Sequence, residues 1–250
     1  MRFFDSNCFI GRPLAAMLKP APTADDLLAE MDRAGIEKAL VWHVVQRDCA
    51  VPSGNDLLTE QLAGHADRLT GCWAILPPQT GELPPPDEFC DAMAAANVRA
   101  LRAFPDRHNY LLRRESCGPL LEVLIQRRIP LILEAHSPGQ WQTAYDLLRD
   151  FPDLVCVLAD MHVWGTDRWF RPLVESYEHV YVELSEYILD GGVTAFVESY
   201  GAERLLFGTG FPKLEHGGVM LMLKHAEITD EQKQDIAAGN LERILANAQL

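Results

Sequence analysis

The fold is decided by the stretch from Leu131 to Trp164, in which LILEAH (131–136) and LVCVLADMH (154–162) flank QWQTAYDLLRDF (140–151). The outer segments have the length and apolar content of buried strands. The central segment has apolar residues at helical spacing and is followed by Pro152. Strands joined through a helix run parallel and bring their carboxyl ends to one edge of a sheet. The stretch therefore predicts a βαβ unit with a ligand-binding edge.

Each of these two strands ends in an acid-x-histidine pair. Glu134 and His136 end the first strand, and Asp160 and His162 end the second. Successive side chains of a strand point to opposite faces, so the members of each pair share a face. Because the two strands are parallel neighbours, we expect all four side chains at the same edge of the sheet.

The composition of the chain excludes several classes of protein. The chain has 250 residues, 48% of them hydrophobic, and a net charge of −14. This acidity argues against nucleic acid and anionic membrane surfaces as partners. No apolar run reaches the length of a membrane span, and no secretion signal is visible. The six cysteines show no C-x-x-C spacing. Together these features predict a cytoplasmic protein.

The remaining chain repeats the same alternation of strand and helix. We expect eight strands, at 2–9, 38–45, 69–76, 98–104, 131–136, 154–162, 180–185 and 204–209. Predicted helices lie between them, at 24–34, 55–63, 87–96, 120–128, 140–151, 169–177 and 193–200, with two more at 219–226 and 230–245. Residues 105–116 are expected to form a long polar loop. This pattern predicts one (β/α)₈ TIM barrel over residues 1–250; a doubly wound sheet is the alternative.

Three motifs carry a resemblance to a known family. They are FDSNCFIG (4–11), LLFGTGFP (205–212) and IAAGNLERIL (236–245). In these motifs the chain resembles the amidohydrolase-related metal-dependent hydrolases, a family that also includes decarboxylases and lactonases. The resemblance spans nearly the whole chain. It implies a TIM barrel and hydrolysis, or a related lyase reaction, of a small molecule.

The resemblance also implies that most metal ligands of the family are replaced. The family's first strand carries Asp-x-His-x-His, which here reads Asp5, Asn7 and Phe9. The fifth-strand histidine corresponds to His136, and the sixth-strand histidine position holds Asp160. The eighth-strand aspartate position is glycine, Gly210. Because phenylalanine cannot bind a cation and an amide is a poor zinc ligand, the usual metal mechanism is not expected.

Polar residues nevertheless gather near the predicted carboxyl ends of the strands. They are Asn7, His43, Arg102, Glu134, His136, Asp160, His162 and Glu183. One hypothesis is a relocated site for one divalent ion (zinc, iron or manganese) held by Glu134, His136, Asp160 and His162. Its alternative is that no metal is bound and the carboxylates hold the histidines by hydrogen bonds.

A second hypothesis is metal-free acid–base catalysis. Crowded carboxylates at the barrel mouth would favour a protonated form of at least one, which suits Glu134 and Asp160 as general acid and base. His136 and His162 would then carry protons. Arg102 would hold a substrate carboxylate, or would instead form a structural ion pair with one of the acids. A third hypothesis is a catalytically inactive barrel that binds a small molecule or a protein partner.

Other residues have weaker assignments. His43 would line the pocket or lie in the core, and Trp164 would contact a substrate ring or anchor a helix. The segment 107–114 would be a basic lid or a solvated loop. The apolar run at 219–223 favours a homodimer. The expected function is thus that of an amidohydrolase-like hydrolase, or a related lyase, acting on a small anionic molecule such as a lactone.

Overall fold

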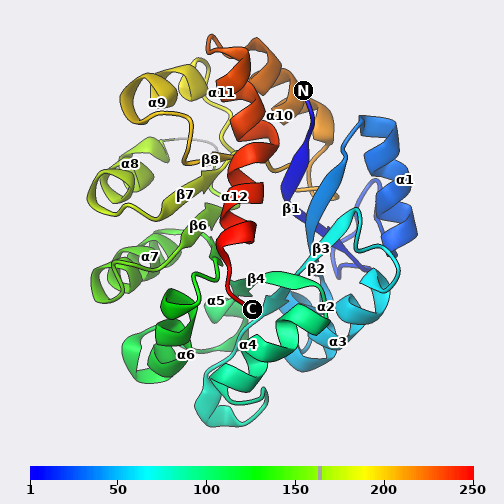
Figure 1. Cartoon of the computed structure of the whole chain (residues 1–250), viewed down its shortest axis with the longest axis vertical. Helices are drawn as coiled ribbons and strands as arrows, with labels where there is room; N and C mark the ends of the chain where they lie inside the picture. The colour runs from blue at the N-terminus through cyan, green and yellow to red at the C-terminus, as the bar shows by residue number, and fades with distance from the viewer. Residues whose placement is uncertain (163–164) are drawn as a thin grey trace.

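Short apolar strands alternate with helices to form an eight-stranded parallel barrel with the helices outside it (Figure 1). The computed structural model describes residues 1–162 and 165–250. The strands are β1 (Phe4–Ile10), β2 (Lys38–His43), β3 (Leu69–Ala74), β4 (Val98–Ala103), β5 (Leu131–Glu134), β6 (Cys156–Ala159), β7 (Val180–Glu183) and β8 (Leu205–Leu206). Each strand pairs in parallel with the next along the chain, which confirms the predicted TIM barrel.

The helices largely follow the apolar periodicity of the sequence. They are α1 (Ala24–Ala34), α2 (Val45–Asp48), α3 (Val51–Leu62), α4 (Pro86–Ala95), α5 (Pro105–His108), α6 (Arg114–Gln126), α7 (Pro138–Asp150), α8 (Asp167–Ser176), α9 (Gly192–Tyr200), α10 (His216–His225), α11 (Asp230–Gln234) and α12 (Asn240–Asn247). Short helical segments η1 (Pro78–Thr80) and η2 (Asp235–Gly239, a π-helix) complete the set. Helix α1 has the predicted bounds, because Thr23 caps its first turn and Gly35 ends it in a left-handed conformation.

Several predicted elements are wrong in their extent, among them the helix expected at 55–63, which begins at Val51, and the strand expected at 154–162, which spans only Cys156–Ala159. The loop expected at 105–116 contains α5 and the first residues of α6, which begins before Pro119 rather than after it. The expected helix at 230–245 is divided by the π-helix η2. The eighth strand has only two residues, because the chain after Leu206 leaves β7 and pairs with β1 instead.

Backbone hydrogen bonds between β1 and the segment after β8 close the barrel. The Ser6 amide donates to the Phe207 carbonyl at 2.9 Å, and the Phe9 amide donates to the Phe211 carbonyl at 3.0 Å. In the other direction, the Gly210 amide donates to the Asn7 carbonyl at 2.8 Å. These bonds fix Asn7 at the seam, close to where both ends of the sheet meet.

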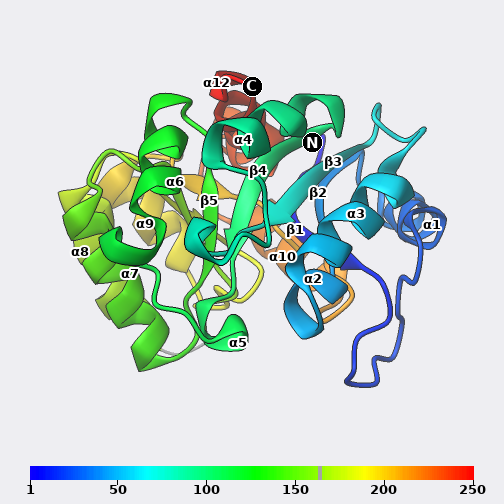
Figure 2. The same cartoon turned by 90° about the horizontal axis from the view of Figure 1, so that it is seen from below.

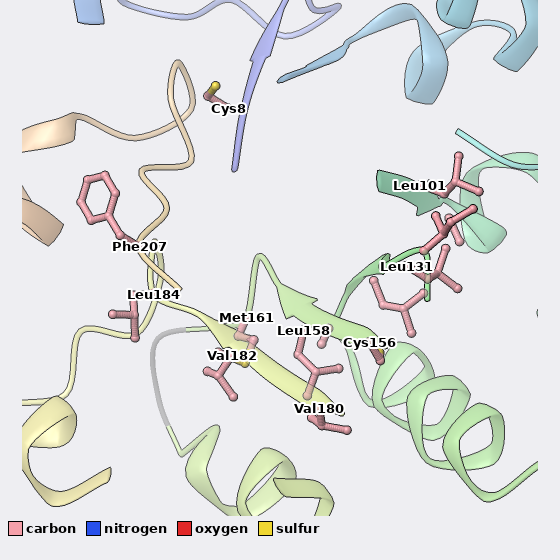
Figure 3. Close-up of a cluster of buried hydrophobic side chains, with 14 of the residues drawn as sticks. Cys8, Leu101, Leu131, Cys156, Leu158, Met161, Val180, Val182, Leu184 and Phe207 are labelled. Carbon is pink, nitrogen blue, oxygen red and sulfur yellow. The ribbon is translucent and has the colours of Figure 1, made fainter. Parts of the chain in front are cut away.

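Alternate residues of the strands form two separate apolar layers. Outward-facing side chains such as Leu131 and Leu158 pack against the helices, and Figure 3 shows this layer beside the strands. Inward-facing side chains such as Ile132 and Val157 fill the barrel. The same parity places Arg102 and Glu134 on the inner face, because they lie two residues after Ala100 and Ile132.

One end of the barrel is closed and the other is not. Leu241, Ile244 and Leu245 of α12 pack with Phe4 and Val155, which lie at the amino ends of their strands. Helix α12 accordingly crosses the barrel in Figure 1, and in Figure 2 it lies at the end opposite α5. The carboxyl ends of the strands are therefore left for a pocket. Within residues 1–162 and 165–250, no helix has the length and apolar character needed to cross a bilayer.

Candidate active site

A pocket of about 390 Å³ opens at the carboxyl ends of the strands. Its floor carries Asn7 from β1, Glu134 from β5 and Asp160 from the end of β6. Phe9 and Trp42 form an aromatic side, with ring centroids 4.7 Å apart. The barrel therefore brings polar groups from strands far apart in sequence to one cavity, as its topology predicts.

Arg102 lies beneath the floor of the pocket and contacts the residues that form it. Its side chain is 0% exposed, and its guanidinium lies 4.9 Å from the Trp42 ring centroid. Nη1 donates a hydrogen bond to Asn7 Oδ1 at 2.9 Å, and Nη2 donates to Asp160 Oδ2. Glu134 Oε1 is 3.8 Å from Nη2. Burial alone would lower the pKa of Arg102, but Asp160 and Glu134 raise it, so the guanidinium stays charged.

The sequence left open whether Arg102 binds a substrate carboxylate or forms a structural ion pair, and the placement of Arg102 bears on this choice. A guanidinium that is fully buried and bonded to Asn7 and Asp160 has the geometry of an ion pair. The side chains of Asp160 and Glu134 line the pocket and that of Arg102 does not. A substrate would therefore contact the two carboxylates before it could reach Arg102. The structural alternative is thus favoured over the direct anion clamp.

Asn7 and Glu183 form a second layer beneath the pocket. Asn7 Nδ2 donates to Asp160 Oδ1 at 3.2 Å and to Glu183 Oε2 at 3.0 Å. Glu183 is buried and also accepts from the Ser185 amide at 2.5 Å and the Ser185 hydroxyl at 2.8 Å. Burial raises the pKa of Glu183 to about 8. Glu183 is therefore mostly protonated at neutral pH and orients Asn7 rather than facing substrate.

Glu134 differs from Asp160 in its surroundings. Asp160 uses both carboxylate oxygens, one for Asn7 and one for Arg102. Among the described residues, no hydrogen bond to the Glu134 carboxylate is formed, and its nearest cation is Arg102 at 3.8 Å. Burial raises the pKa of Glu134, while Arg102 opposes that rise. Glu134 has a raised pKa, and no described residue holds its carboxylate by a hydrogen bond, so it is better placed than Asp160 to exchange a proton.

Three cationic side chains stand around this floor. Arg47 from α2, Arg107 from α5 and Lys213 from the segment after β8 all line the pocket. Arg47 is bonded to Asp48 at 2.7 Å, and Lys213 Nζ is bonded to Glu186 at 2.5 Å. Within the described part of the chain, no carboxylate lies within 4.0 Å of Arg107. Arg107 is thus the cation most available to an anionic ligand, in line with the basic lid interpretation.

The two histidines lie nearer the rim than the floor. His136 lines the pocket, but its side chain is 54% exposed, and its Nδ1 is 3.9 Å from Glu186. The His162 ring centroid is 5.0 Å from that of His136. Asp160 has a φ of 51°, which ends the strand alternation at this point. The predicted common face of Asp160 and His162 stays a prediction.

The other candidate residues are distributed as follows. His43 is buried, its Nδ1 accepts from the Val45 amide at 3.2 Å, and its ring packs against Gly11, which fits the core interpretation. Burial lowers the pKa of His43. Trp164 lies outside the described residues. Arg113 and Arg114 bind Asp146 and Glu122 on the outer helices, so that part of the segment 107–114 is not a lid.

Asp5 has a structural role at the barrel seam. Its carboxylate accepts from the Asn7 amide at 3.0 Å, the Thr209 amide at 2.9 Å and the Thr209 hydroxyl at 2.5 Å. Burial raises the pKa of Asp5 to about 6, and the Thr209 hydroxyl partly offsets this rise. Asp5 thus links β1 to the segment after β8.

Comparison with known proteins assigns the family. The sequence model described as amidohydrolase matches residues 6–246, so the chain belongs to the amidohydrolase family. No curated protein matches the chain significantly.

Solved structures share the fold at low identity. An uncharacterized TIM-barrel protein from Bordetella bronchiseptica is 18% identical, with 99% of each chain covered and a TM-score of 0.74. The 5-carboxyvanillate decarboxylase of Sphingomonas paucimobilis is 14% identical over 98% of this chain and 99% of its own, with a TM-score of 0.72. A dihydroxybenzoic acid decarboxylase from Polaromonas sp. JS666, solved with manganese and 2-nitroresorcinol, is 14% identical over 98% and 97%, with a TM-score of 0.75.

The side chains of this pocket do not fit the metal ion of such relatives. No group of three or more His, Cys, Asp or Glu side chains in the described ranges is arranged to hold a metal ion. This includes Glu134, His136, Asp160 and His162, so the relocated metal site is not supported. The reason is visible at the floor, where the Arg102 guanidinium already lies against the carboxylates.

Several pocket residues were missed from the sequence. Arg47 and Gln140 lie in helices after the strands, and Lys213 follows the family-like motif at 205–212. Lys213 had the clearest signal, because it is the first cation after that motif. Burial lowers the pKa of Lys213, but Glu186, Asp160 and Glu134 together more than offset this and raise it.

Proposed function

We propose that this chain is a metal-independent hydrolase of a small lactone or ester that carries a carboxylate. The observation that carries the proposal is the contrast between Glu134 and Asp160 on one pocket floor. Asp160 is fixed by Asn7 and Arg102, while Glu134 is partly desolvated and free to exchange a proton. Membership of the amidohydrolase family supports hydrolytic or lyase chemistry at this end of the barrel.

In the proposed reaction, ionised Glu134 removes a proton from water as the water oxygen attacks the substrate carbonyl carbon. The carbonyl oxygen becomes negative, and Lys213 offsets this charge from the pocket wall. The carbon–oxygen ester bond then breaks, and Glu134 returns its proton to the leaving oxygen. One ester and one water yield one acid and one alcohol, and Glu134 ends in its starting state.

Arg107 and Arg47 are proposed to bind the substrate carboxylate. A guanidinium binds a carboxylate with two parallel hydrogen bonds, and Arg107 has no competing carboxylate within 4.0 Å among the described side chains. The decarboxylases of similar fold are named for aromatic carboxylates, which agrees with an anionic substrate. Phe9 and Trp42 offer an aromatic side to a ring.

The test is a hydrolysis assay over a panel of lactones and esters, with and without a carboxylate, followed by proton release and by NMR. We expect Glu134→Gln to lower kcat by about 100-fold or more, as expected for loss of a general base. Arg107→Met should raise KM for carboxylate-bearing substrates only. The exposed Glu88→Gln serves as the matched control for the first variant.

Three results would contradict the proposal. Full activity in Glu134→Gln would remove the assigned base. Release of carbon dioxide from aromatic acids without ester hydrolysis would favour the lyase alternative. Binding of anions with no turnover of any compound would favour the inactive barrel.

A further inference from the structure

We propose that the Arg102 guanidinium takes the place of the family's divalent metal ion as the fixed positive charge at the barrel mouth. The first observation is which residues it contacts. Its Nη1 bonds to Asn7 at 2.9 Å and its Nη2 bonds to Asp160. Family resemblance places both residues at metal-ligand positions, one on the first strand and one after the sixth. Both therefore face a side-chain cation of this chain.

The second observation is that this cation is built in permanently. Arg102 is 0% exposed and lies against two neighbouring aromatic rings, 4.9 Å from the Trp42 centroid and 5.5 Å from that of Phe104. A guanidinium remains charged at any physiological pH, and its planar donors match carboxylate and amide oxygens. Contacts with both rings favour the charged form further. The positive charge is thus covalently part of β4.

The third observation concerns charge balance on the floor. Arg102 offsets Asp160 directly and lies 3.8 Å from Glu134. Glu183 is bonded to Asn7 and does not contact Arg102 directly. A divalent ion bound to the same carboxylates would lie beside the guanidinium, and the two like charges would repel each other strongly in this buried setting. Arg102 therefore excludes the metal by charge as well as by volume.

This inference predicts that removing Arg102 creates a metal site. Arg102→Ala would leave a space bordered by oxygen atoms of Asp160, Glu134 and Asn7. Carboxylate and carbonyl oxygens are the ligands that Mn²⁺ prefers. Two carboxyl groups without their cation, Asp160 and Glu134, would attract Mn²⁺ and release any bound proton when it binds.

The experiment uses the full chain, stripped of metal by chelator and then titrated with MnCl₂ alone. Binding is followed by calorimetry, by the electron paramagnetic resonance signal of free Mn²⁺ and by Tm. We expect no binding and no Tm change for the wild-type chain up to 1 mM Mn²⁺. Arg102→Ala should bind one Mn²⁺ per chain, and its Tm should rise by about 3 °C or more at saturation.

Arg99→Ala is the matched control, because Arg99 lies on the same strand but is exposed on the outside. It should behave as the wild type. Asp160→Asn in the Arg102→Ala background should lose the new site. If Arg102→Ala fails to fold, the inference is tested with Arg102→Lys and the wild type. Both chains keep a cation at position 102, so neither is expected to bind Mn²⁺, and binding by the wild type would contradict the inference.

Two outcomes would overturn the inference. One is a wild-type chain that binds one Mn²⁺ and loses it in Asp160→Asn. The other is a folded Arg102→Ala that binds no Mn²⁺, since Arg102 would then not be what excludes the ion. The inference goes beyond the proposed hydrolysis and does not depend on it. The Mn²⁺ titration measures binding and the hydrolysis assay measures turnover, so failure of the Arg102 inference and failure of the proposed hydrolysis can be told apart.

Discussion

The stability of the barrel mouth depends on Arg102, and this gives the sharpest prediction. In Arg102→Met the long apolar side chain retains most of the volume but removes the charge. Asp160 and Glu134 then lose their cation, and the amide oxygen of Asn7 loses its donor. The expected result is a large loss of stability at neutral pH, because buried carboxylates remain without a partner.

The size of the effect follows from the geometry. Removing one partner of a buried ion pair costs about 3–5 kcal/mol. The contact between Arg102 and Glu134 at 3.8 Å corresponds to about 4 kcal/mol for an effective dielectric constant of about 20. For a chain of this length, each kcal/mol lowers Tm by about 2–4 °C. We therefore expect the Tm of Arg102→Met to lie about 6–20 °C below that of the wild type at pH 7.5.

The effect should depend on pH with a defined sign. Without Arg102, the folded-state pKa of Glu134 rises further above that of the unfolded chain, because burial is no longer opposed by this cation. Such groups stabilise the folded state below the unfolded-state pKa and lose that contribution as pH rises. The stability gap between wild type and variant should therefore be smaller at pH 5 than at pH 8.

The assay is urea unfolding followed by circular dichroism at pH 5, 6.5 and 8, with Arg99→Met as the control. The double variant Arg102→Met/Asp160→Asn should lose about 0.5–3 kcal/mol less unfolding free energy than the sum of the losses in the two single variants. A loss below about 1 kcal/mol at pH 8, or a gap that does not change with pH, would refute the buried ion pair as the main interaction of Arg102.

Three further predictions concern other parts of the barrel. The pKa of Glu183 is raised from 4.5 to about 8, so its contribution of up to about 5 kcal/mol is full below pH 4.5 and lost as pH rises to about 8; Glu183→Gln should remove this slope in urea titrations. In Gly208→Ala the new methyl group would overlap the Glu183 carboxylate and cost about 1–3 kcal/mol of unfolding free energy, whereas Gly217→Ala, with open space around it, should not. Arg2→Ala removes a two-bond pair with Glu242 at 2.6 and 2.7 Å that is partly exposed, so the loss should stay below about 1 kcal/mol.

The fold was predictable because its signals are local and repeated. Alternating apolar residues define the strands, and Thr23 and Gly35 define the ends of α1 without reference to the rest of the chain. The start of α6 was not predictable in this way. The helix was predicted to start at residue 120, but its first turns precede Pro119 although proline disfavours a helix interior, and Cys117 of these turns is buried in the core.

The floor of the site was predictable, and its wall was not. Strand parity brings Asn7, Arg102, Glu134 and Asp160 to one edge, and the structure places all four together. The positive φ of Asp160, which ends the regular strand geometry there, has no signal in a strand pattern. Arg47 and Lys213 come from segments after the strands, whose course depends on tertiary packing. The homodimer expected from residues 219–223 stays a prediction; only Leu221 of that run is strongly exposed.

The polar network at the mouth is better accounted for by function than by stability. A buried ion pair adds little net stability compared with apolar side chains of similar volume. Here Arg102 and Asp160 form such a pair, and protonated Glu183 and Asn7 are placed beneath it. Together they hold the Asp160 carboxylate in place and leave Glu134 beside it, facing a pocket with cationic walls. A barrel that only had to fold would gain more from an apolar floor, whereas this floor gives two neighbouring carboxyl groups different chemistry, as acid–base catalysis requires.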